Sequence, residues 1–183
     1  MVSKITNKII ALFFILLFLP MWIIVFIILR ILYPKRSAIY KAQRYGKDMK
    51  LFSMYKFSTM IPGKRIIDPN NPLLHSDNDH RITKFGKFLR KFSIDETLQL
   101  INVLKGDMFI IGPRPCEYEE IKLFPKERFY IYPGISGVVC RWKKKQPSMK
   151  EIYDAELYFA THYGFKVKFK AMLNGIMLLW RNK

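Results

Sequence analysis

An apolar run without a single charged side chain, residues 9–29, constrains the fold more than any other feature of this chain. As one continuous helix it would extend roughly 30 Å, about the thickness of the hydrocarbon core of a bilayer. The run is not followed by a small-residue cleavage site, which argues against a removed signal peptide. Residues 1–34 are therefore expected to hold the protein at a membrane.

Two membrane topologies are compatible with this run. Pro20 lies at its centre, where it removes a backbone hydrogen bond and tends to bend a helix. Basic residues flank both ends, with Lys4 and Lys8 before the run and Arg30 and Lys35 after it. Because positive charge normally marks the cytoplasmic side, both ends compete for that side. A re-entrant helix that bends at Pro20 satisfies both ends, whereas an ordinary spanning helix with a proline satisfies one.

The composition favours a partner that carries negative charge. The chain has 183 residues, with 32 basic and 14 acidic side chains and a net charge of +18. This excess indicates anionic lipid, a phosphorylated substrate or nucleic acid. Because half of the residues are hydrophobic, disorder is not expected. The two cysteines and three histidines lack metal-type spacing, so we do not expect a zinc site.

The rest of the chain, residues 35–183, is expected to form one domain. The fold class is α+β: a small, mostly helical, membrane-associated domain with a few short strands. The basic, aromatic stretch 33–50 is interpreted as interfacial and residues 68–79 as a loop. We expect strands at 51–60, at 108–111 and within 131–142, and helices at 82–92, 93–105, 117–124, 151–161 and 165–180, the last of them amphipathic.

Two adjacent carboxylates begin one of these helices. Ser93 and Glu96 have the spacing of a capping box, in which each side chain satisfies a free backbone amide. Asp95 would lie in the first turn, where the helix dipole stabilises the ionised form and binds phosphate. Arg90 and Arg114 can donate pairs of hydrogen bonds to phosphate oxygens, and the prolines on both sides of Arg114 fix its backbone.

This arrangement can perform phosphoryl transfer. An ionised aspartate can attack phosphorus and form an acyl phosphate, which divides one transfer into two steps. Mg²⁺, held by Asp95 and substrate oxygens, would neutralise the diphosphate. The structural alternative is that Glu96 only completes the capping box and Asp95 only stabilises the helix.

The residues around the two carboxylates are similar to a known family. Residues 90–108 read Arg-Lys-Phe-Ser-Ile-Asp-Glu-Thr-Leu-Gln-Leu-Ile-Asn-Val-Leu-Lys-Gly-Asp-Met, and Gly-Pro-Arg-Pro follows at 112–115. This block resembles the bacterial sugar transferase family of small monotopic phosphoglycosyl transferases. The resemblance extends to further blocks in the same order, at residues 43–46, 55–60, 81–90 and 132–137, and to Asp154 and Tyr158.

The resemblance implies a two-step transfer at the cytoplasmic face of the bacterial inner membrane. Asp95 would take a phosphosugar from a UDP-sugar and release UMP. A polyprenol phosphate, such as undecaprenyl phosphate, would then accept the phosphosugar in the first membrane step of glycan synthesis. Glu96 would assist catalysis, and Lys56, Arg90 and Arg114 would bind substrate.

The resemblance also implies a membrane helix that re-enters at a break near Pro20. The expected partners are membrane lipids, and either a second copy of the chain or later glycosyltransferases of the pathway. Nucleic acid is not an expected partner.

The chain departs from the family pattern at three places. Thr97-Leu98 replaces Leu-Pro after the two carboxylates, Ser58 replaces an arginine, and the residues that follow Gly137, including Cys140, differ. A hypothesis of another class is therefore a membrane-tethered basic binding or scaffold protein without catalysis. It predicts strongly salt-dependent binding that does not require Asp95 or Glu96.

Overall fold

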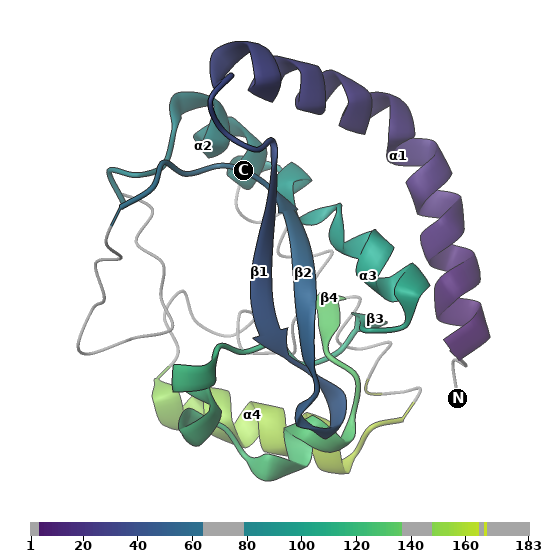
Figure 1. Cartoon of the computed structure of the whole chain (residues 1–183). Coiled ribbons are helices and arrows are strands. Elements are labelled where there is room, and N and C mark those ends of the chain that lie inside the picture. Colours follow the sequence, from purple (N-terminus) through teal and green to yellow (C-terminus); the bar gives the residue numbers. More distant parts are fainter. Residues whose placement is uncertain (1–3, 64–78, 137–147, 165–166, 168–183) are drawn as a thin grey trace.

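The computed structural model describes residues 4–63, 79–136, 148–164 and 167. Figure 1 shows one long helix that curves over a mixed body of short helices and strands. The α+β class with short strands is confirmed. The helix expected at 165–180, most of the loop at 68–79 and the region around Cys140 lie outside the described residues.

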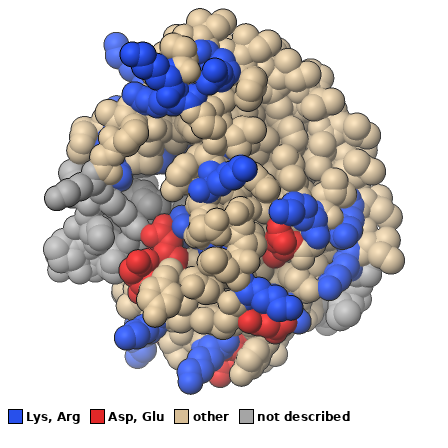
Figure 2. Space-filling view, viewed as in Figure 1, with Lys and Arg blue, Asp and Glu red and all other residues tan. Residues whose placement is uncertain are grey.

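The apolar run forms helix α1, Lys4–Leu32, which is continuous through Pro20. The break expected at this proline is therefore not an interruption of the helix. In Figure 1, α1 nevertheless changes direction between its two halves. Its inner side packs on helix α3 and strand β3, and its outer side exposes many large apolar residues. In the space-filling view most of the surface along α1 carries no charge (Figure 2).

A two-stranded antiparallel hairpin lies beneath α1. Strand β1, Ile39–Tyr45, pairs with β2, Leu51–Phe57, and Ala42 lies opposite Met54. The short 3₁₀ turn η1, Lys47–Met49, lies between them. Strand β2 was predicted, but β1 was not, because its lysine, arginine and tyrosines are typical of an interfacial segment.

The segment that carries the two carboxylates is divided into short helices. Helix α2, Lys84–Lys91, begins at Thr83, whose hydroxyl accepts a hydrogen bond from the Gly86 amide. The 3₁₀ turn η2, Ile94–Glu96, follows, and then helix α3, Gln99–Lys105. Gly106 ends α3 in a left-handed conformation with φ of 91°, as its position after Lys105 predicted.

The remaining elements form the lower part of the molecule in Figure 1. Strand β3, Phe109–Ile111, pairs in parallel with β4, Gly134–Ser136. Two 3₁₀ helices lie between them in the sequence, η3 at Tyr118–Leu123 and η4 at Lys126–Tyr130. Helix α4, Met149–Thr161, packs on η4 and begins with a capping box between Ser148 and Glu151.

The main hydrophobic core connects helix α1 to the body. Trp22, Val25 and Leu29 of α1 cluster with Leu98, Val103 and other residues of the hairpin and α3. The same side of α1 holds Asn7, which accepts a hydrogen bond from the Ile110 amide at 3.1 Å. Helix α1 therefore contacts the body near both of its ends.

Asn102 connects α3 to the hairpin by hydrogen bonds within the core. Its side chain is fully buried; Nδ2 donates to the Ser53 carbonyl at 2.7 Å, and Oδ1 accepts from the Tyr55 amide at 3.1 Å. Burial of these backbone groups is favourable only while they are paired.

We expect Asn102→Leu to lower the free energy of unfolding by about 2–4 kcal/mol, because two buried backbone groups lose their partner. Urea unfolding in detergent, followed by circular dichroism, measures this change. Gln43→Ala is the matched control, because the exposed Gln43 amide bonds only the Ser53 hydroxyl in the described part of the chain. Equal, small effects of both changes would contradict this role of Asn102.

Candidate active site

Three elements bring the predicted catalytic residues together. The turn η2 contacts both β2 and α2. It supplies Asp95 and Glu96, while β2 supplies Lys56 and α2 supplies Arg90. The close approach of α2 to the end of β2 depends on Gly86, because a Cβ atom there would overlap the carbonyl oxygen of Thr59.

The turn η2 differs from the helix start that the sequence predicted. Ser93 adopts a left-handed conformation, φ 54° and ψ 24°, and its side chain makes no capping hydrogen bond in the described part of the chain. The predicted Ser93–Glu96 capping box is therefore wrong. The Glu96 carboxylate instead points to a neighbouring strand, where it contacts Lys56 Nζ at 2.8 Å. This rules out the interpretation of Glu96 as only a capping residue.

Asp95 is a buried carboxylate, with an exposed fraction of 6%. Burial is the main cause that raises its pKa, to about 6, and the Glu96 charge raises it further. Lys56 and Arg90 act in the opposite direction and lower the pKa. The sequence predicted that the turn would favour the ionised form, but burial outweighs the nearby cations and raises the pKa instead.

Arg90 is held beside the carboxylates by a neighbouring residue. Its Nε donates to the Thr59 hydroxyl at 2.9 Å, and Thr59 itself is buried. This contact uses one edge of the guanidinium. The site therefore places one ammonium and one guanidinium group around an adjacent pair of carboxylates, an arrangement suited to anionic oxygens.

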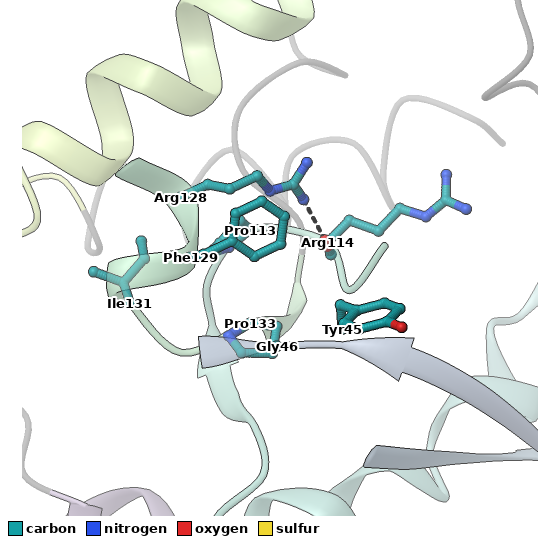
Figure 3. A pocket seen from close by; sticks show the side chains of 8 residues that line it. All are labelled: Tyr45, Gly46, Pro113, Arg114, Arg128, Phe129, Ile131 and Pro133. Atoms are coloured by element: carbon teal, nitrogen blue, oxygen red, sulfur yellow. Dashed lines mark hydrogen bonds between the residues drawn. The ribbon is translucent and has the colours of Figure 1, made fainter. Parts of the chain in front are cut away.

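Arg114 lies in a second group of charges. Its Nη2 is 3.4 Å from Glu120 Oε1, and its backbone carbonyl accepts a hydrogen bond from Arg128 Nη2. Figure 3 shows both arginines at a small pocket. The pocket is also lined by Tyr45, Phe129, Gly46, Pro113 and Pro133. The structure thus groups Lys56 and Arg90 with Asp95, and groups Arg114 with Glu120 and Arg128.

Arg128 of this second group and its neighbour Glu156 were not predicted from the sequence. The Arg128 guanidinium is buried 3.6 Å from the centre of the Phe124 ring, and its Nε lies 3.8 Å from Glu156 Oε2. Burial raises the pKa of Glu156 and Arg128 lowers it, burial being the larger cause. A signal in the sequence was available, because Glu156 lies three residues before the buried Phe159 and so on the same face of the helix. Asp154 and Tyr158, which the resemblance had singled out, are exposed.

The carboxylates offer a limited set of metal ligands. Among the described residues there is no group of three or more His, Cys, Asp or Glu side chains that could hold a metal. Mg²⁺ commonly binds one or two carboxylates and takes its other ligands from substrate phosphates and water. Asp95 and Glu96 fit this donor set but not that of a closed protein cage.

Comparison with known proteins identifies the family. Residues 1–182 match the bacterial sugar transferase family, and the chain belongs to it. It is 35% identical over 156 residues to the undecaprenyl-phosphate galactose phosphotransferase of Salmonella typhimurium, covering 79% of this chain and 32% of that protein. It is 39% identical over 106 residues to the UDP-glucose:undecaprenyl-phosphate glucose-1-phosphate transferase of Xanthomonas campestris, covering 54% and 21%.

A third relative carries a different sugar in its name. The UDP-N-acetylgalactosamine-undecaprenyl-phosphate N-acetylgalactosaminephosphotransferase of Aeromonas hydrophila is 36% identical over 127 residues, covering 66% of this chain and 29% of the relative. The chain therefore spans about a third or less of the length of these relatives. Their names agree on a lipid phosphate and differ in the sugar.

The raised pKa of Asp95 predicts a cost in stability. In the folded state Asp95 binds its proton more tightly than an exposed aspartate with pKa 3.8 does. Protonation of Asp95 therefore stabilises the folded state fully below about pH 4, and this stabilisation is lost as the pH rises through about 6. We expect Asp95→Asn to stabilise the protein at pH 7.5 relative to pH 4, by up to about 3 kcal/mol. Thermal unfolding at both pH values measures this, and a pH-independent difference would contradict the burial argument.

Proposed function

We propose that this protein transfers a phosphosugar from a UDP-sugar to a polyprenol phosphate in a membrane, with Asp95 as the nucleophile. The observation that carries the proposal is the buried Asp95 carboxylate, which is grouped with Glu96, Lys56 and Arg90 under a membrane helix. Family membership supports the reaction class, and the names of the relatives support both substrate classes.

In the first step an Asp95 carboxylate oxygen attacks the phosphorus that bears the sugar. A new P–O bond forms, the bond from this phosphorus to the bridging diphosphate oxygen breaks, and UMP leaves with that oxygen. A desolvated carboxylate is a stronger nucleophile than a hydrated one, and donor binding would bring the phosphate charge near Lys56 and Arg90.

In the second step an oxygen of the polyprenol phosphate attacks the same phosphorus. The acyl phosphate bond breaks, Asp95 is regenerated as a carboxylate, and the product is a polyprenol diphosphate sugar. Glu96 is the candidate base that removes a proton from the acceptor phosphate, because it is adjacent to Asp95 and its side chain is 42% exposed.

The cationic groups have separate roles in this proposal. Lys56 and Arg90 neutralise the phosphate that reacts, and Arg114 binds another part of the donor from the second group of charges. Mg²⁺ would be held by Asp95, with Glu96 as a second available carboxylate, and by donor oxygens; when bound, it would neutralise the diphosphate.

We also propose that α1 is a re-entrant helix with both ends at the cytoplasmic face of the inner membrane. Asn7 near its start and Leu29 near its end both contact the body, so the helix lies along the domain instead of leaving it. Its outer side is apolar over almost its whole length, as contact with lipid requires. Figure 2 shows basic side chains near the end of α1, where they suit anionic headgroups.

Exchange of Asp95 for Asn should abolish UMP release from a UDP-sugar in nanodiscs that contain polyprenol phosphate and Mg²⁺, because an amide cannot form the acyl phosphate. A screen of UDP-glucose, UDP-galactose and UDP-N-acetylgalactosamine identifies the donor. The matched control is Glu119→Gln, which removes an exposed carboxylate outside the site and should retain activity. Full activity of Asp95→Asn would refute the nucleophile.

The topology can be tested by cysteine labelling in intact cells. In a variant with both native cysteines replaced by serine, Ser3→Cys and Lys35→Cys should both react with a membrane-impermeant maleimide only after the inner membrane is permeabilised. The two positions flank α1, so equal protection indicates that both ends lie on the cytoplasmic side. Labelling of Ser3→Cys from outside would establish a spanning helix.

A further inference from the structure

We propose that Trp22 and Thr97 are positioning residues, which hold the turn η2 with its nucleophile Asp95 against helix α1. The two residues lie 75 positions apart in the sequence, one in α1 and one directly after η2. Their effect on catalysis depends on the function proposed above. The contact itself is a property of the fold and can be tested without activity.

The contact is a chain of two hydrogen bonds. Trp22 Nε1 donates to Thr97 Oγ1 at 2.8 Å, and Thr97 Oγ1 donates to the Ile94 carbonyl at 2.7 Å. The indole has only a donor, and the hydroxyl can accept one bond while it donates another. The chain therefore runs in one direction, from α1 to the backbone of the residue before Asp95.

The turn η2 needs support from outside. It is a single 3₁₀ turn, and its closing backbone bonds are long: 3.3 Å from the Glu96 amide to Ser93 and 3.2 Å from the Thr97 amide to Ile94. Ser93 before it is left-handed, which is unfavourable for a residue with a side chain. The Thr97 hydroxyl reinforces the second of these bonds, and Trp22 fixes that hydroxyl.

Trp22 is a rigid anchor for this turn. Only 8% of it is exposed, and it belongs to the core cluster that also holds Val25, Leu29 and Leu98. It lies in α1 two residues after Pro20, in the half of the helix that ends near α2 in Figure 1. The contact thus fixes the position of the turn that carries Asp95 relative to the apolar outer surface of α1.

The test compares four variants of the full-length protein in nanodiscs: Thr97→Val, Thr97→Ser, Trp22→Phe, and the Thr97→Val/Trp22→Phe double variant. Valine and phenylalanine keep most of the shape and remove the hydrogen bonds, while serine retains the hydroxyl. Thr161→Val is the control, because that hydroxyl also bonds a backbone carbonyl, Leu157 at 2.8 Å, but lies in α4.

Two readouts are measured for each variant. The first is steady-state UMP release, where we expect Thr97→Val and Trp22→Phe each to lower kcat about three- to tenfold, with less than a twofold change in donor KM. The double variant should lose no more than the single variants, because both remove one chain of bonds. The second is hydrogen exchange of the Glu96 and Thr97 amides, which should become about three- to tenfold faster.

The outcomes separate this inference from the proposed function. Faster exchange and lower kcat in Thr97→Val and Trp22→Phe, with Thr97→Ser and Thr161→Val close to wild type, support the positioning role. If the wild-type protein releases no UMP but the exchange pattern is as expected, the proposed function fails and the contact stands. Unchanged exchange in both single variants, or additive losses of kcat in the double variant, overturn the inference.

Discussion

The burial of one carboxylate, Asp95, is the constraint on which the rest of the site depends. An unpaired buried charge is unfavourable, so the fold must surround it with groups that tolerate both of its charge states. Lys56 and Arg90 provide positive charge that lowers the pKa of Asp95, while burial and, to a smaller extent, the adjacent Glu96 raise it. The resulting pKa of about 6 leaves Asp95 mostly ionised at neutral pH.

This site requires the long apolar helix α1 as a structural part of the domain. Helix α1 buries Trp22, Val25 and Leu29 against the core that supports η2 and α3, while its outer surface remains apolar. One helix therefore offers an apolar surface on its outer side and supports the turn of the two carboxylates from its inner side. The proposed reaction would need such a boundary, because a water-soluble donor and a lipid acceptor reside in different solvents.

The sequence predicted the parts of this structure that depend on local patterns. The apolar run, the short basic helix with its Arg90, strand β2 and the end of α3 at Gly106 all follow from spacing and residue type. It failed where distant residues decide the conformation. Glu96 contacts Lys56 instead of capping a helix, and the buried pair of Arg128 and Glu156 joins segments that no local pattern relates. Strand β1 was missed because its partner strand, not its own periodicity, makes it a strand.

The most direct test of the account is to isolate the covalent intermediate. The protein in nanodiscs without polyprenol phosphate is incubated with a radiolabelled UDP-sugar, quenched and digested, and the peptides are sequenced by mass spectrometry. The account predicts a phosphosugar on Asp95, which disappears when polyprenol phosphate is added before the quench. A label on another residue, or active protein that never carries one, would contradict a mechanism through Asp95.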